Sequence, residues 1–567
     1  MLPADRLYKN TASFSSCLML YTLYFVVLAG VLSLLTCWSP PPLGDDNDID
    51  YHEQDVTSWG QSALQQMVAW SWRSWTGRRH PIFDPPKRHG YFIHITDLHI
   101  DEEYMAGSNV HTDCHRFGSK SAITQSAGLL GTPGAKCDSP IELAEKTLDY
   151  ISREWRDKID FVVWTGDNSR HDWDKKYRPR KRKAIYHLNE RVQQMMQRAF
   201  WPTARDPRHI PVVPTLGNND VYPHNTMGSG DDEADLLQFF SRLWQPWIPT
   251  DQRATFRQGG YFAVNVGPRL RVLSLNTMYF YHKNDAVKKC SSPGSPAHDM
   301  LLWFERELIR ARAAHVRVYV MGHVPPTTKH YRKSCIRGYT RIAAAYPDVL
   351  MGHFFGHLNM DHFLMLDARD AEDDDDDDDD FSHLSSINTN NEDDDDDHVH
   401  TSRNINKYVN WLRDMYEDID PIDHHHAAHF NQMPVVAVQV APSVLPVYYP
   451  AIRIYKYEIH DDDDRAQCHH GSDKRPHGTL LEYNQFYANI TRWEEELETD
   501  IDETPLNYEF EYNSRDAYEL DDLTITSYYN LAKRMIATDD GGEGQRLWSR
   551  YVQNMFVQAL NDSSFPL

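Results

Sequence analysis

Five short motifs in this chain carry side chains that bind metal ions. They are Asp97-Leu98-His99, Gly166-Asp167-Asn168, Gly217-Asn218-Asn219-Asp220, Gly322-His323 and Gly356-His357-Leu358-Asn359. Most of them follow an apolar run typical of a strand. Oxygen and nitrogen ligands without thiolate favour Zn, Mn, Fe or Co over copper(I) or an iron–sulfur cluster. The ordered set therefore predicts two divalent metal ions side by side at the ends of neighbouring strands.

The elements that must position these motifs are short and alternate along the chain. Strands are expected at 91–95, 161–164, 212–215, 261–266, 270–275, 316–321, 350–352, 363–366 and 435–440. Helices are expected at 141–153, 183–199, 233–243, 298–314, 527–535 and 547–560. Strand–helix alternation followed by paired strands predicts an α/β (α+β) fold, a two-sheet β-sandwich flanked by helices.

The wording around the motifs resembles the calcineurin-like metallophosphoesterases of the acid-sphingomyelinase-like branch. The resemblance rests on FIHITDLH at 92–99, WTGDN at 164–168, FFGH at 354–357 and APSVLP at 441–446. Within that branch, NND at 218–220, GHLN at 356–359 and LTITSY at 523–528 look like the fungal vacuolar endopolyphosphatases. The resemblance covers residues 90–365 and 433–560.

The resemblance implies a role for each motif residue. Asp97 and His99 hold one metal ion, and Asp167 bridges the two ions. The ligands of the second ion are Asn218, His323 and His357. Asp167, Asn219 and His323 are the expected catalytic residues. The two ions, which are Mn, Co, Mg, Zn or Fe, clamp phosphoryl oxygens and acidify a bridging water to hydroxide.

Two positions depart from the family pattern. Asn219 stands where the family usually has a histidine that protonates the leaving oxygen, and Asn359 stands where it usually has a second metal-binding histidine. An amide carbonyl can still ligate, so Asn359 is expected to complete the first metal site. Asn219 cannot act as an acid, and an alkoxide leaving group would lose the roughly 10²–10⁴-fold that general acid catalysis supplies. A phosphate leaving group needs no proton, so this departure favours an anhydride substrate.

The expected function is therefore an endopolyphosphatase, which cleaves phosphoanhydride bonds inside inorganic polyphosphate and releases shorter chains. One alternative is a phosphodiesterase of the same fold acting on a sphingomyelin- or nucleotide-type substrate. Another is a metal-depleted, non-catalytic binding subunit. No nucleic-acid partner is expected, and the oligomeric state is open.

A basic run after the bridging aspartate is the expected binding track for the polyanion. Its residues are Arg170, His171, Lys175, Lys176 and Arg178, which would neutralise phosphates along the chain. The formal net charge of −25 is unfavourable for binding such a substrate. However, residues 370–397 supply 16 of the negative charges and lie in a low-complexity insert at 367–432, too polar to bury a core.

The N-terminal segment predicts a membrane anchor. Residues 17–38 are apolar and long enough for one spanning helix, with Arg6 and Lys9 before them and four aspartates after them. A signal peptide is the rival interpretation. The expected organisation is a cytosolic N-terminus (1–16), a type II signal anchor (17–38), a lumenal stalk (39–89), the metallophosphoesterase domain (90–460) and a C-terminal helical region (461–567). The resemblance places the body in the lumen of the vacuole.

Cysteines and sequons agree with a lumenal body. The most local pairing joins Cys114 to Cys137 and Cys290 to Cys335, although four cysteines allow three pairings and Cys468 is left over. Asn489 and Asn561 begin the two sequons expected to carry glycan.

Overall fold

The structure is a computed structural model, and its described residues are 89–117, 125–204, 206–371, 402–419, 434–460, 475–498, 500–538 and 542–559. The chain divides into two units, Met1–Pro85 and Pro86–Leu567, and the fold below is that of the second. The predicted anchor, Asn561 and Cys468 lie outside the described residues. None of the helices in the described ranges is both long and apolar enough to span a bilayer.

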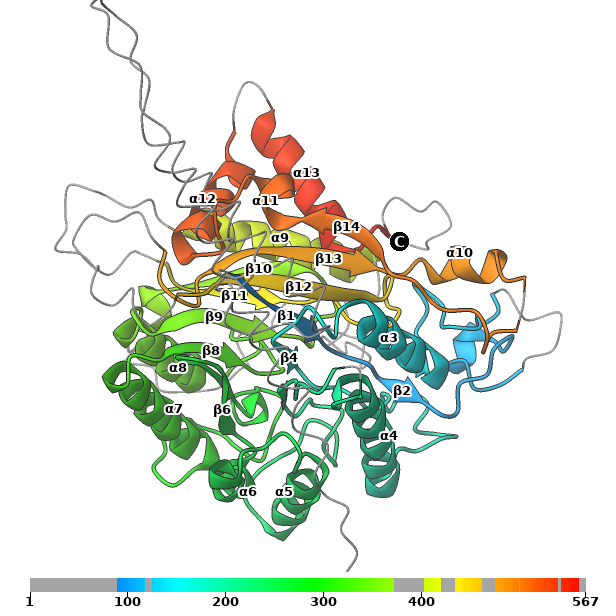
Figure 1. The fold of residues 1–567 in the computed structure, drawn as a ribbon, viewed down its shortest axis with the longest axis horizontal. Coiled ribbons are helices and arrows are strands. Elements are labelled where there is room, and N and C mark those ends of the chain that lie inside the picture. Colours follow the sequence, from blue (N-terminus) through cyan, green and yellow to red (C-terminus); the bar gives the residue numbers. More distant parts are fainter. Residues whose placement is uncertain are drawn as a thin grey trace, which may run out of the picture. The chain divides into compact units, whose positions relative to one another are not determined.

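The first of two six-stranded mixed sheets has the strand order β14-β13-β12-β1-β4-β5 (Figure 1). Its strands are β1 (His89–Ile95), β4 (Phe161–Trp164), β5 (Val212–Pro214), β12 (Ala451–Glu458), β13 (Leu480–Tyr487) and β14 (Glu509–Asn513). β1, β4 and β5 run parallel, whereas β12 to β14 add antiparallel neighbours at the other side of β1. Every residue of β4 and β5 is buried, as expected for parallel strands covered on both faces.

The second sheet has the order β10-β11-β9-β8-β7-β6. Its strands are β6 (Phe262–Gly267), β7 (Leu270–Ser274), β8 (Arg317–Met321), β9 (Leu350–Phe355), β10 (His362–Asp367) and β11 (Pro434–Val440). β7, β8, β9 and β11 are parallel to one another. A small pair, β2 (Ile100–Asp101) and β3 (Ser139–Pro140), lies apart from both sheets.

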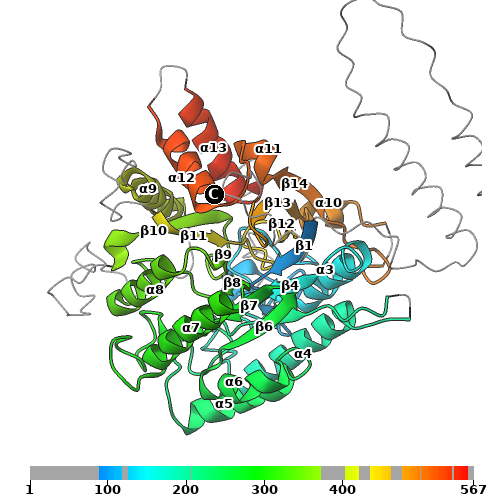
Figure 2. The ribbon, with the colours of Figure 1, turned by 60° about the vertical axis from the view of Figure 1, so that its left-hand side comes forward.

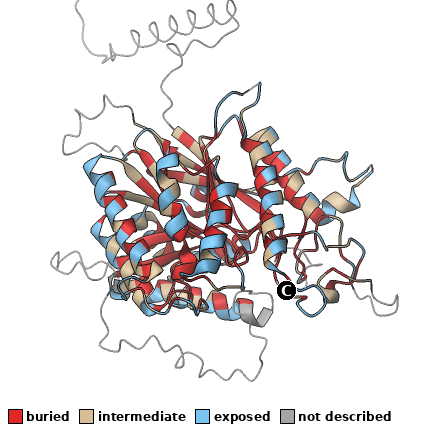
Figure 3. Cartoon of the chain, turned by 90° about the horizontal axis from the view of Figure 1, so that it is seen from below, coloured by how far each residue is buried: buried red, intermediate tan, exposed pale blue. Residues whose placement is uncertain are grey.

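The core lies where the two sheets face each other. Phe92 of β1 stacks on Phe161 of β4 at 4.6 Å and on Tyr455 of β12 at 4.9 Å. Its ring also meets Phe354 of β9 edge-on at 5.3 Å and Tyr319 of β8 at 5.6 Å. Edge-to-face and offset rings at these separations are favourable pairings, and the strands appear almost wholly buried in Figure 3.

Helices cover the outside of the sheets (Figure 2). Those between the strands are α3 (Ile141–Glu154), α4 (Arg182–Phe200), α5 (Asp231–Leu243), α6 (Arg253–Gly259), α7 (Pro296–Ala313) and α8 (Lys333–Ala345). The later helices are α9 (Ser402–Asp418), α10 (Ile490–Glu495), α11 (Ser514–Tyr518), α12 (Ile525–Ile536) and α13 (Glu543–Met555). Single 3₁₀ turns are η1 (Val110–Thr112), η2 (Thr250–Gln252), η3 (Thr277–Tyr279) and η4 (Ala368–Ala371). All nine predicted strands and five of the six predicted helices are confirmed within three residues at their ends, whereas the helix predicted at 547–560 is found earlier, as α13 at Glu543–Met555.

The acidic insert was predicted to lack any packed structure, and this is wrong for α9. Tyr408, Leu412 and Tyr416 are buried, and Tyr416 donates a hydrogen bond to the carbonyl of Phe363 in β10. Their spacing places the three residues on one face of a helix. The two aspartate runs that precede the helix, at 373–380 and 393–397, dominate the composition of the segment and conceal that face.

The C-terminal region is not purely helical. Its first half supplies β13 and β14, which extend the first sheet from β12. Both proposed disulfides are present, with Cα–Cα distances of 5.7 Å for Cys114–Cys137 and 5.0 Å for Cys290–Cys335.

Candidate metal centre

The predicted metal ligands all follow strands that are parallel neighbours within a sheet. Asp97 and His99 come after β1, Asp167 after β4 and Asn218 after β5. From the second sheet, His323 comes after β8 and His357 after β9. Because the carboxyl ends of parallel strands share an edge, both sheets deliver their side chains to one place.

Bonds between the loops hold these strand ends together. The amide of Asp97 donates to the carbonyl of Gly166 at 3.0 Å, and the amide of His99 donates to the carbonyl of Asp167 at 3.0 Å. Asp220 accepts the backbone amides of Asp167 at 3.0 Å and Asn168 at 2.9 Å, which ties the loop after β5 to the loop after β4. The APSVLP segment also contributes, because the amide of Leu445 donates to the carbonyl of Asp97 at 2.8 Å.

Several ligand positions have strained backbones. Asp97, His99, Asp167, His357 and Asn359 have φ values of +51°, +42°, +54°, +72° and +57°. A non-glycine residue in this region costs about 1–3 kcal/mol and persists only where the surrounding structure over-determines it. Five of the thirteen non-glycine residues with positive φ in the described part of the chain are therefore predicted metal ligands.

One group of side chains collects around His99. Its Nε2 lies 3.4 Å from an oxygen of Asp97 and 3.4 Å from an oxygen of Asp167. Its Nδ1 lies 3.1 Å from the carbonyl oxygen of Ser169. A proton on Nδ1 is needed for that bond, so the bare Nε2 lone pair faces two carboxylates, and a cation between them would remove the repulsion.

A second group collects around His323. Its Nδ1 lies 2.8 Å from the carbonyl oxygen of Thr165, so the same tautomer argument applies. Its Nε2 lies 2.8 Å from Oδ1 of Asn218, 3.2 Å from Asp167 and 3.2 Å from Nδ1 of His357. Asn218 Oδ1 is also 2.9 Å from Nδ1 of His357. Three acceptor atoms therefore converge on one point, as they would around a cation.

The orientation of the Asn218 amide is set from behind. Its Nδ2 lies 3.1 Å from Nε2 of His224 and donates to Oδ1 of Asn225 at 3.0 Å. With the NH₂ group directed there, the carbonyl oxygen must point at the two histidines. Neither His224 nor Asn225 was singled out from the sequence, although both follow the Asn218 motif by a few residues.

Asp167 belongs to both groups, and its neighbours stabilise the negative charge of its carboxylate. Burial works to raise the pKa of Asp167, but His323, His99 and the hydrogen bond from Asn219 together hold it well below its usual range. Burial likewise opposes charging of His323, yet Asp167 raises the pKa of His323 to about 9. A cation held between Asp167 and His323 would take the place of that proton.

The donor set fits divalent metal ions. All six side chains are at most 3% exposed, and they offer only oxygen and imidazole nitrogen, as hard to borderline divalent ions prefer. The carbonyl oxygen of Asn359 is buried and has no hydrogen-bond partner within the described residues. Such a group is costly unless a donor or cation satisfies it, which supports its predicted role as a ligand.

Asn219 lies against the shared carboxylate. Its backbone amide donates to Asp167 Oδ1 at 2.8 Å and its side-chain Nδ2 donates to Oδ2 at 2.9 Å. The residue was predicted to be catalytic at the position of the missing acid. The structure shows that it orients Asp167, and its catalytic role stays a prediction.

The predicted substrate track divides into buried and exposed residues. Arg170 and His171 are 6% and 2% exposed, and their role as substrate contacts stays a prediction. Arg170 donates to the carbonyl of Arg178, and Asp138 holds His171. Lys175, Lys176 and Arg178 are exposed, as expected for a track, although Arg178 pairs with Glu103 at 2.8 Å.

Asp138 was missed by sequence reasoning because no motif contains it. Its carboxylate accepts the backbone amide of His171 at 2.9 Å and lies 4.0 Å from His99 Nδ1. Burial raises the pKa of Asp138 to about 7. The ring of His171 stacks on that of His99 at 4.1 Å, so Asp138 supports the first group of ligands.

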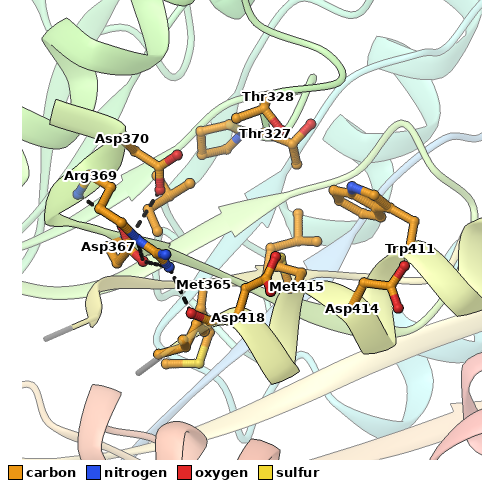
Figure 4. A pocket seen from close by; sticks show the side chains of 14 residues that line it. Thr327, Thr328, Met365, Asp367, Arg369, Asp370, Trp411, Asp414, Met415 and Asp418 are labelled. Atoms are coloured by element: carbon orange, nitrogen blue, oxygen red, sulfur yellow. Dashed lines mark hydrogen bonds and ion pairs between the residues drawn. The ribbon is translucent and has the colours of Figure 1, made fainter. Parts of the chain in front are cut away.

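A pocket of about 240 Å³ between β10 and α9 is separate from this centre (Figure 4). None of the predicted metal ligands lines it. Its walls carry Asp367, Asp370, Asp414 and Asp418, whose negative charge would repel a phosphate chain. The metal groups, not this pocket, are the site with hydrolytic chemistry.

Comparison with known proteins agrees with a metal-dependent phosphoesterase site. Residues 90–361 match the family model described as calcineurin-like phosphoesterase. Curated relatives named endopolyphosphatase include one from Cryptococcus neoformans (34% identical, 68% of this chain and 61% of the relative) and one from Candida glabrata (33%, 67% and 62%). Another, from Saccharomyces cerevisiae, is 29% identical over 83% of this chain and 86% of its own. The chain thus spans about three-fifths of the length of the first two.

Proposed function

The chain contains a calcineurin-like phosphoesterase domain at residues 90–361, and from that premise we propose that it hydrolyses phosphoanhydride bonds inside inorganic polyphosphate. The observation that carries the proposal is the position of Asp167 in both metal-binding groups, the first with Asp97 and His99 and the second with His323 and His357. A shared carboxylate is what a two-metal hydrolytic centre requires. The name of the curated relatives supports polyphosphate as the substrate.

Some of these residues would bind the metal ions, and others orient the residues that bind them. Asp97, His99, Asp167 and Asn359 would hold one divalent cation, and Asp167, Asn218, His323 and His357 the other. When bound, such a pair would neutralise charge on phosphoryl oxygens and lower the pKa of a bound water. His224 and Asn225 keep the Asn218 carbonyl aimed at the site, while Asn219 fixes both oxygens of Asp167.

The absence of an acid at Asn219 suits an anhydride. Its amide nitrogen donates to Asp167, and an amide has no proton to give at ordinary pH. A phosphate that leaves from polyphosphate is already a stable anion. A diester with an alkoxide leaving group would need the proton that this position cannot supply.

The test compares substrates on purified protein loaded with Mn, Co, Mg, Zn or Fe. Long-chain polyphosphate should be cut to chains of intermediate length, visible on a gel, while sphingomyelin and a chromogenic diester turn over far more slowly. Metal analysis should give two ions per chain. If the diester is cleaved faster than polyphosphate, the protein is a phosphodiesterase and the proposal is wrong. If the protein binds no metal and turns over neither substrate, it is a binding subunit.

We also propose that the body lies in the lumen of the vacuole, anchored through residues 17–38. Two disulfides support an oxidising compartment. Asn489, the first residue of a sequon, is partly exposed at the start of α10. An endoglycosidase should therefore lower the mass of the wild-type protein. The mass of the double variant Asn489→Gln, Asn561→Gln should not change on the same treatment. Digestion of the body by protease added to intact vesicles would contradict this topology.

A further inference from the structure

A column of aromatic rings leads from the metal centre to the protein surface. The ring of His99 stacks on that of His171 at 4.1 Å and 9°, and His171 stacks on Trp173 at 4.0 Å and 3°. The three rings are nearly parallel, so they form one stack. The ammonium group of Lys136 lies over the Trp173 ring, 5.2 Å from its centroid.

Lys136 is held at the end of this column by its own chain. The next residue, Cys137, is bonded to Cys114, and the residue after that, Asp138, accepts two hydrogen bonds from His171. The backbone of Lys136 is therefore anchored on its C-terminal side, by the disulfide and by the same histidine that stacks on His99. An anchored backbone holds the base of the side chain in place, so less freedom is lost when the ammonium group binds a ligand.

The charge of Lys136 is exposed and acts on the nearby carboxylate of Asp113, but no salt bridge of Lys136 is found among the described residues. Two more cations lie on a neighbouring ring, since Arg116 and Lys176 are 4.5 Å and 5.2 Å from the centroid of Tyr177. Arg116 differs from Lys136 because it pairs with Asp174. Tyr177 itself is 60% exposed.

We infer that Lys136, seated on Trp173, is a binding subsite for phosphate groups of the substrate that lie several units along the chain from the bond being cleaved. The inference rests on the proposed function, because only a repeating polyanion reaches both the metal centre and the outer end of the column. A lysine acts on phosphate as a point charge, so the subsite reads charge and chain length. Arg116 and Lys176 extend it along the surface.

The chain offers a matched control. Lys158 is also exposed and lies over a tryptophan, 5.1 Å from the centroid of Trp155. That tryptophan packs on Phe486 of β13 and belongs to no stack with a metal ligand. Lys158→Gln therefore removes the same charge and the same cation–π pair at an unrelated place.

The experiment measures KM for long-chain polyphosphate and for tripolyphosphate in Lys136→Gln, Lys136→Arg and Lys158→Gln. Loss of one exposed charge contact should raise KM for long chains roughly two- to fivefold in Lys136→Gln, with little change for tripolyphosphate and unchanged metal content. Lys136→Arg and Lys158→Gln should behave as wild type. Equal effects of Lys136→Gln and Lys158→Gln would overturn the subsite.

Binding to chelator-treated protein separates the two proposals. Fluorescence anisotropy of labelled polyphosphate should show weaker binding by Lys136→Gln than by Lys158→Gln, without any turnover. If wild type fails to hydrolyse polyphosphate yet this difference remains, the proposed function fails and the subsite stands. If hydrolysis occurs and binding by the two variants is the same, the subsite fails alone.

Discussion

Asp167 is the single residue on which both groups of ligands depend. Its oxygens lie 3.4 Å from His99 and 3.2 Å from His323. Asp167→Asn should lower the rate of polyphosphate cleavage by more than about a hundredfold, the upper end of the loss seen for outer partners of a metal site. It should also lower bound metal, because one neutral amide cannot replace a carboxylate shared by two cations.

Chain shortening on a gel and elemental analysis of the same sample check this prediction. Asp149→Asn, an exposed aspartate on α3, serves as the matched control and should match wild type in both. Near wild-type turnover in Asp167→Asn would contradict the two-metal assignment.

His353 also follows a glycine, as His323 and His357 do, but its environment differs from that of these two predicted metal ligands. It is 5% exposed on β9, and its Nδ1 lies 2.6 Å from the hydroxyl of Tyr339. Burial lowers the pKa of His353 to about 3. In the unfolded chain this histidine has a pKa near 6.5, so it takes up a proton at pH values at which the folded protein keeps it neutral. The free energy of unfolding therefore falls as the pH falls below about 6.5.

His353→Gln should remove that part of the pH dependence. Between pH 7.5 and pH 5, the free energy of unfolding of wild type should fall by about 2 kcal/mol more than that of the variant. Urea unfolding at the two pH values measures the difference, and the buried His94 and His362 titrate in both proteins. Loss of metal from His353→Gln would show instead that this histidine serves the metal centre.

At the scale of elements, the loop between β4 and α4 both supports the metal centre and faces solvent. Its buried residues Arg170 and Arg180 bond to carbonyls, among them that of Asn219. Lys175 and Lys176 are exposed beyond them. The loop thus has one side committed to structure and one side available to a polyanion.

The exposed side gives a prediction of its own. Lys175→Gln combined with Lys176→Gln should raise KM for long polyphosphate more than KM for tripolyphosphate, because a short anhydride meets fewer charges. Added salt should reduce the difference in KM between the variant and wild type, because exposed charges are screened beyond about 8–10 Å at 0.10–0.15 M ionic strength. Steady-state kinetics at two ionic strengths measure both effects. Lys407→Gln, an exposed lysine on α9, is the control, and equal losses on both substrates would place the effect at the metals.

At the scale of the whole molecule, a buried ion pair joins the two sheets near the site. Arg453 of β12 and Asp361, between β9 and β10, are 1% and 4% exposed and are bonded to each other. Tyr512 of β14 donates to the same carboxylate. Asp361 is two residues from Asn359, so the pair connects the C-terminal strands with the loop that carries His357 and Asn359.

Removing one partner of this pair should be costly. Asp361→Asn leaves the Arg453 charge buried without its counter-charge, a change that typically costs about 3–5 kcal/mol. Urea unfolding should show a loss of that size. Asp414→Asn, an aspartate on α9 outside the core, is the control. A loss under about 1 kcal/mol would mean that the pair does not hold the sheets together.

The motifs alone determined which residues would meet, because a polar ligand directly after an apolar strand ends up at a sheet edge wherever its neighbours are parallel. Asp97, Asp167 and His323 could be found in this way, and so could the strands before them. The tertiary structure decided which face of each loop was buried. It placed His171 under His99, brought Asn219 to Asp167 and seated Lys136 on Trp173. It also paired β13 and β14 with β12 and packed α9 on β10. Local sequence shows that a face is apolar or charged, but the partner of that face lies far along the chain, and only long-range packing selects it.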